Sequence, residues 1–70
     1  MKTKDLNLPR SAIENIIDEW IFNAEHRQII KERLLDGVCF EPLAEKHHLS
    51  VQRIKAIVYA GEKQIYRHIQ

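Results

Sequence analysis

The residues between Ser50 and Lys63 combine side chains that can hydrogen-bond to base edges with side chains that can neutralise phosphates. Arginine can donate two hydrogen bonds to guanine, and glutamine can pair with adenine. Lysine and tyrosine more often bind phosphate oxygens, and small apolar side chains can contact the methyl group of thymine. No acidic residue occurs between Glu45 and Glu62. The candidate residues for contacting double-stranded DNA are Val51, Gln52, Arg53, Lys55, Ala56, Tyr59 and Lys63.

Positive charge is concentrated in the last third of the chain. The 70 residues have a formal net charge of only +1, but residues 50–70 hold four Lys or Arg and one Glu. Phosphate-binding surfaces are local, so this asymmetry matters more than the total charge. A helix dipole favours cations near its C-terminus, which can explain Lys63 and Arg67 without any ligand. It does not explain Arg53 and Lys55, which lie near a predicted helix start.

Apolar residues at three- and four-residue spacing predict helices, and no useful period-two alternation predicts a strand. The expected fold class is all-α, a small helical bundle of about four helices with a C-terminal helix-turn-helix at residues 41–60. Residues 1–8 are expected to form a flexible N-terminus ahead of a single domain at residues 9–70. The predicted helices cover residues 9–21, 24–35, 41–48 and 51–68.

Polar and glycine residues mark where these helices begin and end. Asn23 and Ser50 are predicted N-caps, and Gly37 is predicted to close the second helix in a left-handed conformation. Gly61 is the weakest point of the last helix, where a bend is an open alternative to a continuous helix. Glu32 is expected on the exposed side of the second helix.

The last two predicted helices are short neighbours joined by a three-residue break. Leu43 and Ala44 on the first are expected to interlock with Ile54 and Val58 on the second, and the small Ala44 permits a close approach. Leu49 in the turn is expected to fill the gap between the helices. A second helix presented in this way can enter the major groove of DNA.

The segment from residue 35 to residue 65 resembles the C-terminal helix-turn-helix of bacterial sigma factors, called region four. The resemblance implies sequence-specific DNA binding in transcription regulation and contact with RNA polymerase. The chain is expected to be a free-standing module, similar to small regulators of phage and prophage genomes, because it has no room for the promoter-melting sigma domain. The residues that carry the resemblance are Leu35, Gly37, Phe40, Leu43, Ala44, Leu49, Ser50, Ile54, Lys55 and Ile65.

Three positions depart from the pattern of that family. Cys39 stands where the family has a Ser or Thr cap, so the third helix is expected to lack a side-chain cap. Pro42 replaces an acidic residue. His47 and His48 replace a glycine-containing turn, so one of the two is expected to adopt a strained backbone conformation.

Other chemistry is not expected. No acid, base and nucleophile cluster together and no Gly-rich phosphate loop is present, so an enzyme is not predicted. None of the four His has a zinc-ligand spacing with Cys39, so no metal or cofactor is expected. The single Cys39, expected to be half-buried, excludes an intramolecular disulfide. Without a membrane span or a signal peptide, the protein is expected to be cytoplasmic.

Two readings other than DNA binding stay open. The helices can form a protein-interaction module that uses a helix-turn-helix scaffold without touching DNA, or a phage DNA-packaging adaptor. The apolar run Trp20, Ile21 and Phe22 is expected to pack in the core. Its alternative role is a partner surface, including a homodimer contact, because three adjacent side chains on a helix cannot all face one way.

Overall fold

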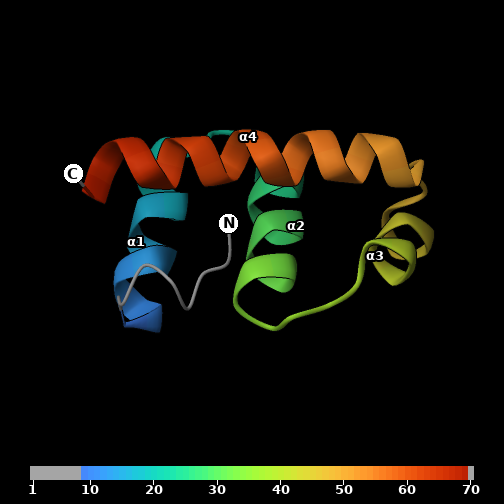
Figure 1. Ribbon diagram of the computed structural model, residues 1–70, viewed down its shortest axis with the longest axis horizontal. Coiled ribbons are helices and arrows are strands. Elements are labelled where there is room, and N and C mark those ends of the chain that lie inside the picture. Colours follow the sequence, from blue (N-terminus) through green and yellow to red (C-terminus); the bar gives the residue numbers. More distant parts are fainter. Residues whose placement is uncertain (1–8, 70) are drawn as a thin grey trace.

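The computed structural model describes residues 9–69 of the chain, with only the backbone described for Ile69. These residues form four helices and no strand: α1 (Arg10–Trp20), α2 (Ala24–Leu34), α3 (Phe40–His47) and α4 (Val51–Ile69) (Figure 1). The prediction of an all-α bundle of four helices is confirmed, and each helix begins within a residue or so of its predicted start. The segment expected to be a flexible N-terminus, residues 1–8, lies outside the described residues.

Two of the four helices, α2 and α4, begin at residues whose side chains cap them. The Oδ1 of Asn23 accepts a hydrogen bond from the His26 N–H at 3.1 Å, and the Oγ of Ser50 accepts one from the Arg53 N–H at 3.1 Å. Both predicted N-caps are therefore confirmed. Cys39 occupies the N-cap of α3 and makes no side-chain hydrogen bond to that helix, as its side chain type predicts.

Two left-handed residues end α2 and α3. Gly37 has a φ of 73°, and the chain then turns so that the Val38 N–H donates to the Glu32 carbonyl at 3.1 Å. His48 has a φ of 56° and a ψ of 41°, which confirms the strain predicted at the histidine pair. The Leu49 N–H donates to the Ala44 carbonyl at 3.0 Å, which closes α3 in the manner of a Schellman motif.

All four helices contribute to one apolar core. Burying one isoleucine, leucine or valine side chain in this core stabilises the fold by about 1.5–3 kcal/mol relative to leaving it exposed. The interlocking predicted between α3 and α4 is present, because Leu43, Ile54 and Val58 are fully buried. The buried apolar residues are Ile13, Ile17, Ile29, Ile30, Leu43, Ala44, Ile54, Ile57, Val58 and Ile65.

Gly61 allows α4 to lie very close to α2. A Cβ atom at this position would lie 2.9 Å from Ile30 Cγ1 and 3.3 Å from Ile30 Cγ2, closer than carbon atoms can comfortably pack. α4 continues through Gly61 as one uninterrupted helix, and its ribbon shows no kink in Figure 1. The glycine is explained by the close crossing of two helices.

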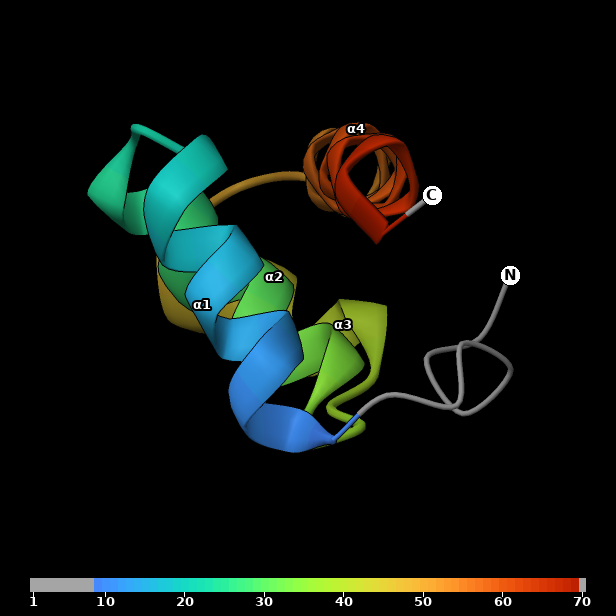
Figure 2. The same ribbon diagram turned by 90° about the vertical axis from the view of Figure 1, so that its left-hand side faces the viewer.

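The other three helices lie on one side of α4 (Figures 1 and 2). α4 has 19 residues and is therefore about 28 Å long, comparable with the longest dimension of the molecule, 32 Å. α1 and α2 run across its direction, and α3 packs near its N-terminal end. The side of α4 that faces away from α1, α2 and α3 is not covered by any other described residue, as the view along its axis shows.

Candidate nucleic-acid interface

Four of the predicted DNA-contacting residues share one exposed surface of α4. Gln52, Lys55, Tyr59 and Lys63 follow one another at intervals of three, four and four residues, which places them on neighbouring turns of one helix side. All four are exposed, and Tyr59 retains 51% of its accessible surface. We call these four residues the α4 outer face. It carries two lysines, an amide and a phenol, and no carboxylate.

An aromatic ring from α3 supports one flank of this face. The Lys55 Nζ lies 5.5 Å from the centroid of the Phe40 ring, and the Tyr59 ring meets Phe40 edge-on with centroids 6.3 Å apart. On the same ring, the Arg33 Cζ lies 4.3 Å from the centroid. Both cations are attracted by the ring quadrupole. Phe40 of α3 therefore brings together Arg33 of α2 with Lys55 and Tyr59 of α4.

Arg33 and Phe40 were not among the residues proposed from the sequence. Phe40 was recognised only as an aromatic position of the helix-turn-helix pattern. Arg33 lies more than twenty positions before Lys55 in the chain, and no short-range spacing connects them. Only the packing of α3 between α2 and the start of α4 brings the two cations to one ring.

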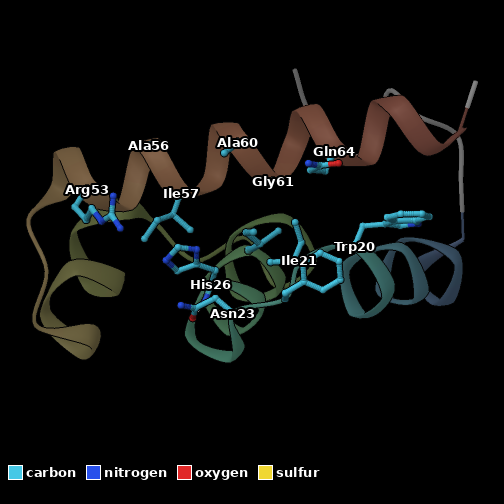
Figure 3. A pocket seen from close by; sticks show the side chains of 12 residues that line it. Trp20, Ile21, Asn23, His26, Arg53, Ala56, Ile57, Ala60, Gly61 and Gln64 are labelled. Atoms are coloured by element: carbon cyan, nitrogen blue, oxygen red, sulfur yellow. The ribbon is translucent and has the colours of Figure 1, made fainter.

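The remaining predicted residues occupy other surroundings. Val51 is half-buried and packs against the core, so less of its side chain is available for a thymine methyl group. Arg53 and Ala56 are exposed but line a groove on the other flank of α4 (Figure 3). The groove has a volume of about 280 Å³ and lies between α4 and the junction of α1 with α2, residues 20–26. The seven predicted residues thus divide between two surfaces and the core.

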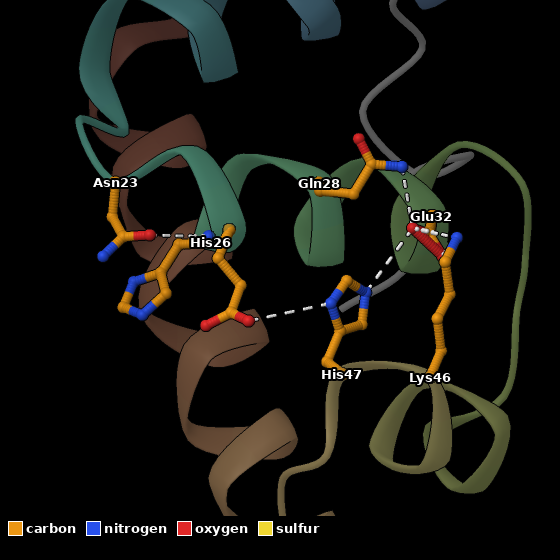
Figure 4. Close-up of polar contacts among 7 residues, drawn as sticks. Asn23, His26, Gln28, Glu32, Lys46 and His47 are labelled. Atoms are coloured by element: carbon orange, nitrogen blue, oxygen red, sulfur yellow. Dashed lines mark hydrogen bonds and ion pairs between the residues drawn. The ribbon is translucent and has the colours of Figure 1, made fainter.

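A buried carboxylate holds α3 against α2 (Figure 4). Glu32 is only 7% exposed, which contradicts the expected position on the exposed side of α2. The Lys46 Nζ donates to its two oxygens at 2.9 and 3.0 Å, and the Gln28 Nε2 donates at 2.8 Å. Burial by itself would raise the pKa of Glu32, but the hydrogen bonds from Lys46 and Gln28 outweigh it and lower this pKa from 4.5. Glu32 is therefore charged at neutral pH and fixes the position of α3.

His47 lies between two carboxylates of α2. Its Nε2 is 3.6 Å from Glu32 Oε2, and its Nδ1 is 3.9 Å from Glu25 Oε2 (Figure 4). The Nε2 is buried and has no hydrogen-bond partner among the described residues. Since His47 directly precedes the turn into α4, these contacts also help to set the position of that turn.

Residues 9–69 contain no group of three or more His, Cys, Asp or Glu side chains that could hold a metal ion. Cys39 is exposed rather than half-buried as expected, because it occupies the extended N-cap position of α3, outside the core. Within the described part of the chain, no helix combines the length and the apolar character needed to cross a membrane.

Comparison of the chain with protein-family models, with curated proteins and with solved structures finds no match. The resemblance to sigma region four therefore stays a prediction from the sequence.

Proposed function

We propose that the protein is a sequence-specific DNA-binding regulator of transcription that places α4 in the major groove. The observation that supports this proposal best is the α4 outer face, which is uncovered and whose two charged side chains, Lys55 and Lys63, are both positive. An α-helix of this kind fits the major groove of B-form DNA, which is about 12 Å wide. α3 and its three-residue turn hold the N-terminal half of the helix in place.

Each outer-face residue has a distinct role in the proposal. Gln52, in the first turn of α4, reads the edge of an adenine, as the amide of glutamine does in other major-groove readers. Lys55 and Lys63 bind phosphates on either side of the groove, and Tyr59 donates its hydroxyl to a phosphate. Arg53, on the flank of α4 near its N-terminus, can reach a phosphate at the edge of the contact.

The Phe40 ring supports the phosphate-binding role of Lys55 and adds Arg33 to it. A lysine that lies over an aromatic ring has fewer conformations to lose when it binds a phosphate than a free lysine has. Arg33 on the same ring adds a second cation beside Lys55. We therefore include Arg33 as a phosphate-binding residue of the proposed interface.

The resemblance to sigma region four adds a finer proposal, that the DNA-bound module contacts RNA polymerase. A gel-shift assay with promoter DNA, with and without added polymerase, tests this part separately. A slower-migrating ternary complex is expected, and independent binding of the two proteins to DNA would contradict the polymerase contact.

Selection of bound duplexes from a random pool tests the DNA-binding function. We expect enrichment of one short motif, and we expect Gln52→Ala to relax the preference at one base pair, at a cost of about 1–3 kcal/mol in discrimination. Gln64→Ala is the matched control, because Gln64 lies on the same helix but lines the groove. No enrichment, together with no affinity for duplex DNA at low salt, would contradict the proposal.

A further inference from the structure

The groove between α4 and residues 20–26 has an apolar floor and an unusually apolar rim. Ile30 and Ile57 line its base, while Trp20 and Phe22 remain 42% and 82% exposed. Core packing was expected for Trp20, Ile21 and Phe22. The expectation is wrong for the exposed Trp20 and Phe22, and only Ile21 packs against the core. Aromatic side chains exposed beside a hollow are typical of binding surfaces, where they act as anchors.

The exposed position of Phe22 is fixed by its backbone. The Arg27 Nη1 donates to the carbonyls of Ile21 and Phe22 at 2.9 and 3.2 Å. Asn23, the next residue, caps α2. These hydrogen bonds therefore fix the backbone of the α1–α2 link both before and after Phe22. A partner that binds Phe22 loses little additional backbone entropy, because the link is already ordered.

The charge of the groove favours a partner that carries a carboxylate. Arg53 is the one permanently charged side chain that lines it, at the end opposite Trp20 (Figure 3). No Asp or Glu lines the groove, and among residues 9–69 no carboxylate lies within ion-pair distance of Arg53. A partner that supplies a carboxylate would satisfy this guanidinium and gain orientation from it.

A second copy of the chain fits this groove less well. In a two-fold symmetric contact the same surface meets itself, so each Arg53 would face a surface lined by Arg53 and His26 and by no carboxylate. The volume of about 280 Å³ is also at the lower limit of pockets that hold small molecules, about 300–1,000 Å³. It suits one or two apolar side chains presented by a larger partner.

We infer that this groove binds a short amphipathic helix of an acidic partner protein. An apolar side chain of that helix lies between Phe22 and Ile57, and a carboxylate on its flank pairs with Arg53. Helices bound in this way use anchors at intervals of three and four residues. The groove is on a different flank of α4 from the outer face, so this inference does not depend on DNA binding. Arg53 is the one residue assigned to both surfaces, and it can pair with a DNA phosphate or with the partner carboxylate, but not with both at once.

Titration with two designed peptides tests the inference. The first is an N-capped peptide of about 15 residues, with Leu at helical spacing on one side and Glu on the other. The second is identical except that every Glu is replaced by Lys. Trp20, the single tryptophan of the chain, lies at the groove and reports binding by its fluorescence. No DNA is present, so the result is independent of the proposed regulatory function.

We expect the acidic peptide to shift the Trp20 emission and to bind at least about fivefold more tightly than the basic one. Arg53→Gln should remove this preference, while Phe22→Ser should weaken binding of the acidic peptide by about tenfold or more. Lys55→Gln is the matched control for charge, because Lys55 lies on the other flank of α4. It should leave the preference intact. Phe22 is too exposed for its substitution to unfold the protein.

Three results would overturn the inference. The first is equal affinity for the two peptides, or no binding of either. The second is an equal effect of Lys55→Gln and Arg53→Gln, which would show a general charge effect in place of a contact. The third is a concentration-dependent dimer, measured by light scattering, that Phe22→Ser abolishes. This dimer would assign the groove to a second copy of the chain.

Discussion

Glu32 and Lys46 form a two-oxygen ion pair that joins α2 to α3, with Nζ–O distances of 2.9 and 3.0 Å. The carboxylate is buried, while the lysine side chain is 59% exposed. The buried carboxylate of Glu32 thus lies at the contact between α2 and α3, where its ion pair holds α3 in place. The ammonium group of Lys46 stays partly in water. The position of the helix-turn-helix relative to the rest of the bundle therefore depends on an ionised Glu32.

The depressed pKa of Glu32 predicts a loss of stability in acid. A carboxylate with a lower pKa in the folded than in the unfolded protein contributes stability that is present above the unfolded value, near 4.5, and lost as the pH falls through the folded value. Urea unfolding from pH 7 to pH 3 should show this decline. Glu32→Gln should be less stable at pH 7 and should show a weaker decline in acid. An identical pH profile for the variant and the wild type would contradict the role of Glu32.

A serine at position 39 should stabilise α3. Cys39 has the extended backbone of an N-cap, with φ −68° and ψ 160°, but its side chain makes no cap hydrogen bond. Cys39→Ser should supply one and raise the free energy of unfolding by about 1 kcal/mol. Cys39→Ala, which cannot cap, is the control in the same thermal or urea measurement. Equal stability of the Ser and Ala variants would show that the cap does not form.

Glycine at position 48 should also stabilise the protein. His48 adopts a left-handed conformation that costs an L-residue about 1–2 kcal/mol, whereas glycine adopts it without steric cost. Part of this gain is offset by the greater entropy of a glycine in the unfolded chain. We expect a net increase of about 0.5–1 kcal/mol in unfolding free energy for His48→Gly. His47→Gly, within α3, should destabilise, and a reversal of this order would contradict the assignment.

Gly61→Ala should destabilise the protein although alanine favours helices. Helix propensity alone would add about 1 kcal/mol of stability, but forcing a methyl group into a packed crossing costs about 1–3 kcal/mol. The new Cβ would meet the side chain of Ile30, whose Cδ1 atom is the nearest to it. Ile30→Val removes that atom, so the double variant should be more stable than the sum of the two single changes predicts. Strict additivity would contradict the proposed contact.

Features that depend only on residues close together in the chain, such as helix caps and helix ends, could be predicted from the sequence. The caps at Asn23 and Ser50, the left-handed Gly37 and the strained histidine pair all follow from residue type and position. The helix boundaries follow from the apolar spacing. Glu32 was misplaced, because the exposed side of a single helix says nothing about a later helix that covers it. Phe22 was misplaced because the end of α1 and the direction of the link decide its exposure.

The candidate interface was predicted only in part, because some of its residues meet only through the packing of distant helices. Gln52, Lys55, Tyr59 and Lys63 share one side of a helix, and helical periodicity is visible in a sequence. That Arg53 lines the groove and does not share this side of α4 can be seen only from the way α4 packs on the other helices. The meeting of Arg33 and Lys55 at Phe40 needs the packing of three helices, which no local pattern encodes.

The salt dependence of DNA affinity tests the central claim most directly. If Lys55, Lys63 and Arg33 neutralise about three phosphates, log K should fall with log salt with a slope of about −2.7, or about 40-fold between about 50 and 200 mM. Lys55→Gln with Lys63→Gln should reduce the magnitude of this slope by about 2. Lys31→Gln is the control, because Lys31 pairs with Asp18 of α1 at 2.7 Å. An unchanged slope and affinity in the double variant would contradict DNA binding by the α4 outer face.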